Sequence, residues 1–122
     1  MKKVYIAGSY SSDNIIQSLE NIRRFMRMGT ELILKKFVPL VPGFDHQFFF
    51  QLREGESISL EMIQSYSIEL LKMADAVLVL KGFELSKGTE AELKVAYAMD
   101  KPVFYNLSDL LEWDAIIEQE PI

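Results

Sequence analysis

The chain has 122 residues, and its 49% apolar and 25% charged content suit one globular domain over residues 1–122, which excludes a disordered or fibrous protein. The net charge of −5 argues against nucleic acid or an anionic membrane as a partner. The absence of cysteine excludes disulfides, iron–sulfur clusters and a thiol nucleophile. The N-terminal residues lack the long apolar core of a signal peptide, and no run is long enough to span a membrane, so we expect a cytoplasmic protein.

The N-terminal part of the chain predicts a strand, a long helix and a second strand. Residues 3–7 are a short apolar strand, and Ser12 or Asp13 can cap the helix that follows. Residues 37–41 are predicted as a strand, and Pro39 favours a sheet edge because proline has no amide hydrogen to donate. The apolar stripe of the helix keeps helical spacing over its whole length: Ile15, Leu19, Ile22, Met26, Gly29 and Ile33.

Residues 42–57 show no helical or strand period and are predicted as a loop. They contain Asp45, the only histidine of the chain, His46, and three consecutive phenylalanines at 48–50. A loop of this length in a small domain is usually functional or mobile. His46 therefore either contacts a substrate or lies in solvent. No His, Asp or Glu shows metal-ligand spacing with it, so no metal site is expected.

The rest of the chain alternates helices and strands. An apolar run from Val77 to Leu80 is typical of a parallel strand covered on both faces. The alternation predicts right-handed crossovers and a doubly wound α/β sheet of four or five parallel strands in the order 2-1-3-4, with helices on both faces. The expected elements are a helix at 60–74, a strand at 76–81, a helix at about 89–99, a strand at 102–105 and a short helix at 108–118.

The stretch that leads to Glu92 carries the most chemical information. Gly82, Ser86 and Gly88 break the chain after a strand, and Thr89 is a candidate N-cap for the next helix. Glu92 shares the helix face of the apolar residues that follow it, so one carboxylate faces the sheet at the strand ends, where open α/β folds bind ligands. Those apolar residues are Val95, Ala96 and Met99.

Glu92 also has a purely structural interpretation. Thr89 and Glu92 have the spacing of a capping box, in which the glutamate only satisfies a free backbone amide at the helix start. The two roles are compatible, because a helix N-terminus favours the ionised carboxylate that a nucleophile needs. The residues by themselves leave both interpretations open.

A second candidate segment is the small, hydroxyl-rich loop at 8–12, which runs into a helix. Backbone amides there can hold a phosphate or a sugar hydroxyl, although serines before a helix are more often plain caps. Tyr5, on the preceding strand, can orient a carboxylate through its hydroxyl or can pack under a helix. In the expected strand order this loop and the one before Glu92 meet at the same edge of the sheet.

Several segments together are similar to one known family. They are Val-Tyr-Ile-Ala-Gly-Ser-Tyr at 4–10, Asn-Ile-Arg-Arg at 21–24, Phe-Val-Pro-Leu-Val-Pro at 37–42 with His46, Ala-Asp-Ala-Val-Leu-Val-Leu at 74–80, and Ser-x-Gly-Thr-x-x-Glu at 86–92. The chain, to about Asn106, resembles the nucleoside 2-deoxyribosyltransferase-like superfamily. The likeness is closest to short phage and bacterial members of undefined function, and the superfamily also includes 2′-deoxynucleotide N-hydrolases.

The resemblance implies a flavodoxin-like fold and cleavage or transfer at the N-glycosidic bond of a nucleoside or nucleoside 5′-monophosphate, with no cofactor. It makes Glu92 the nucleophile that attacks C1′ of the sugar, and Tyr5 the hydrogen-bond partner of that carboxylate. Family members commonly form homodimers in which a neighbouring subunit completes the pocket. The substrate-binding residues that we predict are Gly8, Ser9, Tyr10, His46, Ser67, Ser86, Gly88 and, from a neighbouring subunit, Asn106.

The chain departs from the family pattern at Ser67. The family usually carries an aspartate there, on the inward face of the helix at 60–74, which helps to protonate the leaving base. A serine hydroxyl cannot act as a general acid near neutral pH, and Asp45 or His46 from the long loop are candidate replacements. Two other classes of function therefore compete with the enzyme: a nucleotide-binding module with little turnover, and a small interaction protein in which Glu92 is only a cap.

Overall fold

In the described residues, four parallel strands form one sheet in the order β2-β1-β3-β4, which confirms the predicted order. The structure is a computed structural model that describes residues 1–83 and 86–119. Its elements are β1 (Lys3–Ala7), α1 (Ile15–Leu34), β2 (Val38–Leu40), the 3₁₀ helix η1 (Pro42–Asp45), α2 (His46–Phe49), α3 (Leu60–Met73), β3 (Ala76–Val79), α4 (Lys87–Ala98), β4 (Val103–Phe104) and α5 (Leu107–Gln119).

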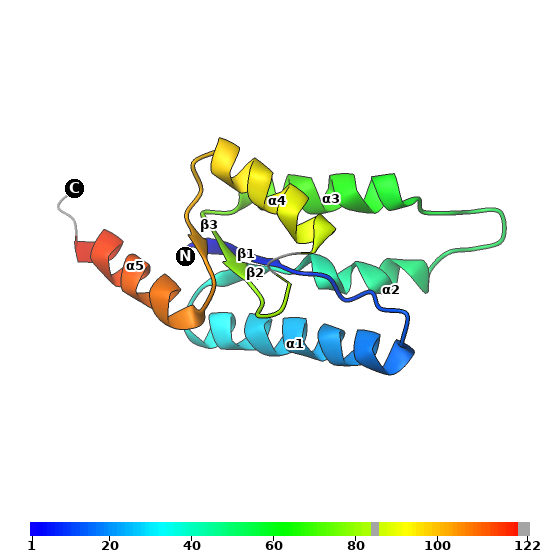
Figure 1. The fold of residues 1–122 in the computed structure, drawn as a ribbon, viewed down its shortest axis with the longest axis horizontal. Helices are drawn as coiled ribbons and strands as arrows, with labels where there is room; N and C mark the ends of the chain where they lie inside the picture. The colour runs from blue at the N-terminus through cyan, green and yellow to red at the C-terminus, as the bar shows by residue number, and fades with distance from the viewer. Residues whose placement is uncertain (84–85, 120–122) are drawn as a thin grey trace.

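Helices cover both faces of the sheet (Figure 1). α3 and α4 lie side by side over one face, and α1 and α5 pack against the other. The central strand β1 shows why, since Val4 and Ile6 pack toward α1 while Tyr5 and Ala7 pack toward α3 and α4. All four side chains are fully buried, as a strand covered on both faces requires. β1 therefore delivers the Tyr5 hydroxyl to the α3–α4 side.

The buried face of α1 lies roughly a quarter of a turn away from the predicted stripe. The residues that pack inward are Ser18, Asn21, Phe25, Gly29 and Leu32. The predicted residues that are exposed instead are Ile15, Leu19, Met26 and Ile33. The inward polar residues hold the loop after β1: the Asn21 amide donates to the Tyr10 carbonyl at 3.3 Å. The Ser18 hydroxyl donates to the Ser12 carbonyl, also at 3.3 Å. The spacing of apolar residues alone does not reveal that these polar residues must face inward to hold the loop.

The helix start of α1 also differs from the prediction. Asn14, rather than Ser12 or Asp13, is the N-cap, and its Oδ1 accepts from the amides of Ile16 at 2.9 Å and Gln17 at 3.3 Å. The Ser12 hydroxyl in turn accepts a hydrogen bond from the Asn14 amide at 3.2 Å. The loop at 8–12 therefore stays irregular up to the helix and leaves its backbone near the sheet edge.

The sequence predicted a loop over residues 42–57, but only part of this segment is a loop. η1 begins at Pro42, whose fixed backbone angle suits a first helical position, and α2 follows it directly. These turns bury Asp45, which is only 4% exposed. The irregular part is confined to the residues between α2 and α3.

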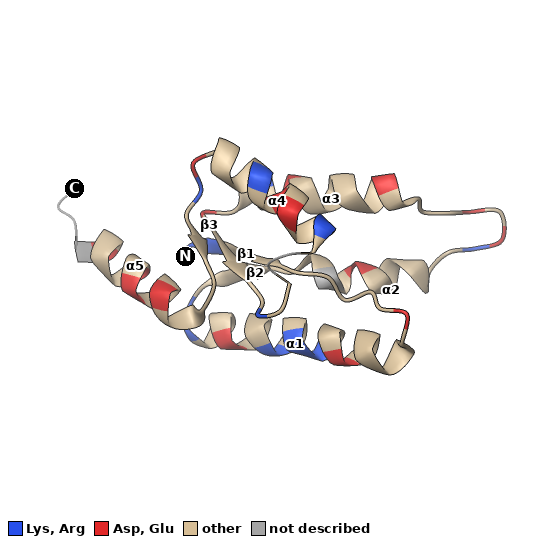
Figure 2. Cartoon of the chain, viewed as in Figure 1, with Lys and Arg blue, Asp and Glu red and all other residues tan. Residues whose placement is uncertain are grey.

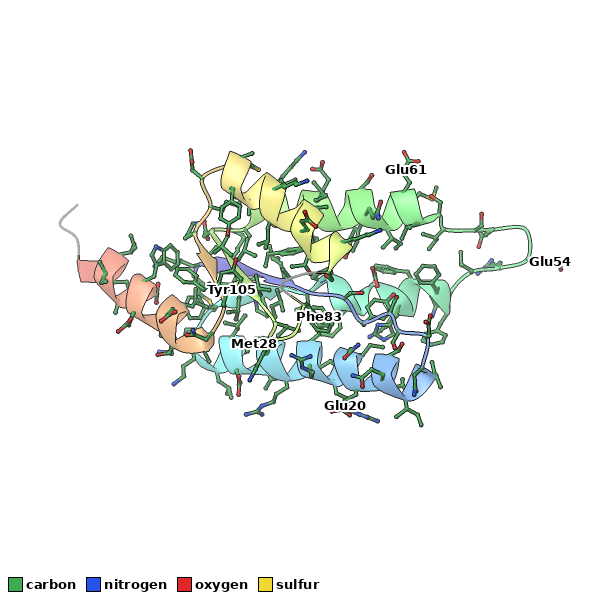
Figure 3. The ribbon with its side chains drawn as sticks, viewed as in Figure 1. Glu20, Met28, Glu54, Glu61, Phe83 and Tyr105 are labelled. Atoms are coloured by element: carbon green, nitrogen blue, oxygen red, sulfur yellow. The ribbon has the colours of Figure 1, made fainter. Side chains whose placement is uncertain are left out.

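Charged residues are spread along the helices and the loops between them (Figure 2). α5 carries only acidic charges, whereas α1 carries both signs. Figure 3 shows Glu20, Glu54 and Glu61 projecting outward, while Phe83 and Met28 pack against the core under α1. Among the described residues, no helix is both long enough and apolar enough to cross a bilayer.

Candidate active site

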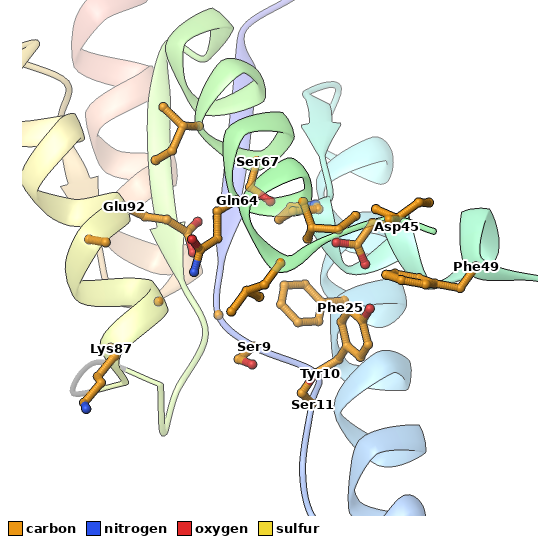
Figure 4. A pocket seen from close by; sticks show the side chains of 18 residues that line it. Ser9, Tyr10, Ser11, Phe25, Asp45, Phe49, Gln64, Ser67, Lys87 and Glu92 are labelled. Atoms are coloured by element: carbon orange, nitrogen blue, oxygen red, sulfur yellow. The ribbon is translucent and has the colours of Figure 1, made fainter. Parts of the chain in front are cut away.

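A cavity of about 640 Å³ opens at the carboxyl edge of the sheet (Figure 4). Its walls come from the loop after β1, the η1–α2 segment, α3 and the first turns of α4. This volume falls in the range of small-molecule sites, which are mostly apolar with a few convergent polar groups. The apolar part of the wall is formed by Phe25, Phe49, Ile58, Leu60, Ile63 and Ile68.

The cap of α4 decides between the two interpretations of Glu92. α4 begins at Lys87, and its N-cap is Ser86, whose Oγ accepts from the Thr89 amide at 3.2 Å. Thr89 lies inside the first turn, where its hydroxyl and that of Ser86 are 2.7 Å apart. The predicted capping box of Thr89 and Glu92 is therefore wrong, because Glu92 sits in the second turn and satisfies no amide at the helix start. Its carboxyl group lines the cavity instead.

Glu92 is 9% exposed, and its Oε2 has no hydrogen-bond partner among the described residues. Burial raises the pKa of this carboxyl to about 7, and the nearby Tyr5 hydroxyl holds that pKa below what burial alone would give. At neutral pH the group is thus divided between its protonated and ionised forms. The cavity therefore contains a carboxyl that titrates within the physiological range.

The Tyr5 hydroxyl is fully buried and lies close to Glu92 and Ser67, although Tyr5 itself is not part of the cavity lining. Burial and then the charge of Glu92 raise the pKa of Tyr5 far above its ordinary range, so the phenol stays protonated. Tyr5 influences the pKa of Glu92, yet no well-aligned hydrogen bond joins Tyr5 Oη to a described residue. Both groups are thus positioned without being mutually satisfied.

The structure brings six of the predicted site residues to the cavity wall: Gly8, Ser9, Tyr10, Ser67, Gly88 and Glu92. The other four, Tyr5, Ser86, His46 and Asn106, lie outside this lining. Ser86 serves as the α4 cap. The His46 ring packs edge-on against Tyr10, with 5.7 Å between ring centroids. Asn106 caps α5, where its Oδ1 accepts from the Asp109 amide at 2.8 Å.

Four polar residues that were not predicted as site residues also line the cavity: Ser11, Asp45, Gln64 and Lys87. The signal for Gln64 was available, because it precedes Ser67 by three residues and so shares its helix face. Lys87 follows the cap of α4 directly. The sequence indicates Asp45 only as a substitute acid, because no helical period is evident around it. Among the described residues, no group of three or more His, Cys, Asp or Glu side chains could hold a metal ion.

Substitution of Gly8 is expected to destabilise the fold, because two aromatic rings lie close to where a β-carbon would be. A β-carbon at this position would lie 2.9 Å from Cδ2 of Phe83 and 3.1 Å from Cζ of Phe25. Gly8→Ala should destabilise the fold by about 1–3 kcal/mol, because the rings must move. Urea denaturation measures this loss.

Gly88→Ala is the matched control, since a β-carbon there meets nothing within 4 Å. It lies in the first turn of α4, so alanine should change stability by less than about 1 kcal/mol or improve it. Equal losses in the two variants would show that contact with Phe25 and Phe83 is not what limits position 8.

Comparison with known proteins identifies the family. The family described as nucleoside 2-deoxyribosyltransferase matches residues 4–121, which is nearly the whole chain. The chain therefore belongs to the nucleoside 2-deoxyribosyltransferase family, as its motifs and α/β fold predicted. No match was found among curated proteins.

Three solved structures share the fold. The 2-desoxiribosyltransferase of Leishmania mexicana is 21% identical, with a TM-score of 0.59 over 84% of this chain and 62% of that one. The 2-deoxyribosyltransferase of Bacillus psychrosaccharolyticus is 23% identical, with a TM-score of 0.55 over 83% and 69%. A conserved protein of Enterococcus faecalis V583 is 20% identical, with a TM-score of 0.60 over 98% and 76%. The chain thus spans less than two thirds of the Leishmania enzyme.

Proposed function

We propose that the protein cleaves or transfers at the N-glycosidic bond of a nucleoside or nucleoside 5′-monophosphate, with Glu92 as the nucleophile. The observation that carries the proposal is the buried Glu92 carboxyl, which lines the cavity with one oxygen unpartnered among the described residues. Membership of the family and the fold shared with two deoxyribosyltransferases support the same chemistry.

The ionised Glu92 attacks C1′ and forms a glycosyl ester as the base departs. Tyr5, which stays protonated, lies beside Glu92, and we expect its hydroxyl to donate a hydrogen bond to the carboxylate once Glu92 is ionised. The apolar wall limits the access of bulk water, so the ester persists until a bound nucleophile attacks C1′. Water in that role makes the protein a hydrolase, and a second base makes it a transferase.

The loop of Gly8, Ser9 and Tyr10 contacts the sugar, since its backbone forms the edge of the cavity nearest β1. A 5′-phosphate, where the substrate has one, lies at the start of α4. Amides at a helix N-terminus favour an anion, and Lys87 adds a positive charge beside Gly88. Ser67 contacts the base, while Ser86 and His46 act indirectly by fixing α4 and Tyr10.

Ser67 favours one alternative, a nucleotide-binding module with little turnover. A serine cannot protonate a leaving base near neutral pH, and the loss of a general acid typically costs about 10²–10⁴-fold in rate. Such a module would still bind nucleotides in the same cavity, because the loop and the helix start remain in place.

Base release from ribo- and deoxyribonucleosides and their 5′-monophosphates, followed by chromatography, separates these functions. Release from at least one substrate is the expected result. Mass spectrometry of protein incubated with a 2′-fluoro-arabino nucleoside should then find the sugar attached to Glu92. Ligand-induced thermal stabilisation without any release would instead establish the binding module.

A homodimer is the expected assembly, because α1 exposes an apolar stripe. Ile15, Leu19, Met26 and Ile33 are spaced by four and seven residues and are 46–71% exposed. Leu19→Glu with Met26→Glu should convert a dimer to a monomer in sedimentation velocity. Asn106, which lies outside the cavity of its own chain, would then contact substrate in the neighbouring copy.

Arg23→Glu with Arg27→Glu, on the polar face of α1, controls for added negative charge. This variant should remain dimeric. A native protein that sediments as a monomer at micromolar concentration would contradict the assembly, and so would dissociation of both variants.

A further inference from the structure

A second carboxyl group lines the cavity on the side opposite Glu92 (Figure 4). Asp45 is the last residue of η1, is only 4% exposed, and lines the cavity. Its Oδ1 has no hydrogen-bond partner among the described residues. A buried polar atom left unpaired costs about 1–3 kcal/mol, so an unpaired oxygen at a cavity wall is suited to meet a ligand group.

The neighbours of Asp45 position it and set its charge. The Tyr10 hydroxyl and the backbone of His46 lie close to the carboxyl group and act to lower its pKa. Burial raises the pKa of Asp45, and the contacts with Tyr10 and His46 only partly oppose that rise. The charge of Asp45 also raises the pKa of Tyr5. Asp45 thus lies at the cavity wall with a pKa above its ordinary value.

No other group that lines the cavity is suited to give up a proton. Within the described residues, the titratable side chains of the lining are Tyr10, Asp45, Lys87 and Glu92. Burial raises the pKa of Tyr10 far above neutrality, so its phenol is a poor acid. Lys87 is exposed at the start of α4, and Glu92 must be ionised to attack. Asp45 remains.

We propose that Asp45 is the proton donor to the leaving base, an inference that rests on the proposed N-glycosidic chemistry. A Glu92 oxygen forms a bond to C1′ while the C1′–N bond breaks and its electron pair moves onto the base. The Asp45 carboxyl proton passes to the base, which leaves as a neutral molecule, and Asp45 becomes a carboxylate. Glu92 is then a glycosyl ester.

The second step restores both groups. Water, or the ring nitrogen of an acceptor base, attacks C1′ and gives its proton to the Asp45 carboxylate. The ester bond to Glu92 breaks, and its electron pair returns to the glutamate oxygen. One buried acid thus serves each half of the reaction in turn, and Ser67 needs no acid–base role.

Asp45→Asn tests the proposal through substrates that differ in their need for a proton. A 7-methylguanine nucleoside releases a neutral base without protonation, and a 5-fluorouracil nucleoside needs less help than its parent. Asp45→Asn should lose about 10²–10⁴-fold in kcat on the ordinary substrate found by base release, and should stay within about threefold of the native protein on the activated counterpart. An equal loss on both substrates, or no loss on either, would overturn the assignment.

Two further variants make the outcome specific. Glu92→Gln should lose activity on both substrates, so its failure to do so would overturn the nucleophile and not the proton donor alone. Asp100→Asn, an exposed position at the end of α4 where asparagine tolerates the φ of 56°, should behave as the native protein. If Asp45→Asn does not fold, Asp45→Glu replaces it, since a displaced acid should lose activity on the ordinary substrate only.

Discussion

Glu92→Gln is expected to abolish base release, with a loss of about 10⁴-fold or more in kcat. Glutamine matches the shape of the glutamate but has no anionic oxygen to form a bond with C1′. The fold should be unaffected, because Glu92 does not cap α4 and its Oε2 makes no hydrogen bond to a described residue. Chromatographic assay of both proteins on the same substrate measures the loss.

Glu90→Gln is the matched control for this variant. Glu90 lies in the first turn of the same helix, where it is exposed, so its replacement removes the same charge without touching the cavity. It should keep full activity, and its stability should fall by no more than about 1 kcal/mol, the usual benefit of an acid near a helix N-terminus. Residual activity of a tenth or more in Glu92→Gln would rule out a glycosyl-glutamate intermediate.

Glu92→Gln is also expected to stabilise the protein at alkaline pH. The pKa of Glu92 is about 7 in the folded protein, whereas its ordinary value, which applies to the unfolded chain, is 4.5. Between these two pH values the folded state therefore retains a proton that the unfolded state has lost. Stability from this group is complete below pH 4.5, declines between pH 4.5 and pH 7, and is lost above pH 7. The full cost of ionising the buried carboxyl is about 3 kcal/mol.

Glutamine does not ionise, so the two proteins should have similar free energies of unfolding at pH 4 and should diverge as the pH rises to 8. Urea denaturation at both pH values measures the difference. Asp45, whose pKa is also raised by burial, adds a slope of the same sign, but it does so equally in both proteins. A constant difference between the two proteins at every pH would show that Glu92 keeps its ordinary pKa in the fold.

The sheet could be predicted because its strands leave a direct mark on the sequence. A strand buried on both faces must be apolar at successive positions, and Val77 to Val79 meet that demand. The alternation of strands with helices then limits the order of the strands. The placement of Glu92 followed from its distance of three and four residues to Val95 and Ala96.

The errors arose where polar contacts, not apolar spacing, decide the structure. α1 turns Ser18 and Asn21 inward because the loop after β1 needs their hydrogen bonds, and this rotates the apolar stripe outward. Ser86 and Thr89 are both good caps three residues apart, and the sequence cannot rank two such similar choices. The sequence could name Asp45 only as a possible substitute acid in a loop, because its burial depends on turns that have no sequence period.

The cavity also limits how stable this protein can be. Tyr5, Asp45 and Glu92 each place a buried oxygen in the fold without a partner among the described residues. A chain selected for stability alone would carry apolar or neutral side chains at these positions and would resist denaturation better. It would also lose the carboxyl groups on which the proposed chemistry depends. Stability and activity are therefore opposed at these positions, and a ligand that pairs with Asp45 and Glu92 should recover part of the lost stability.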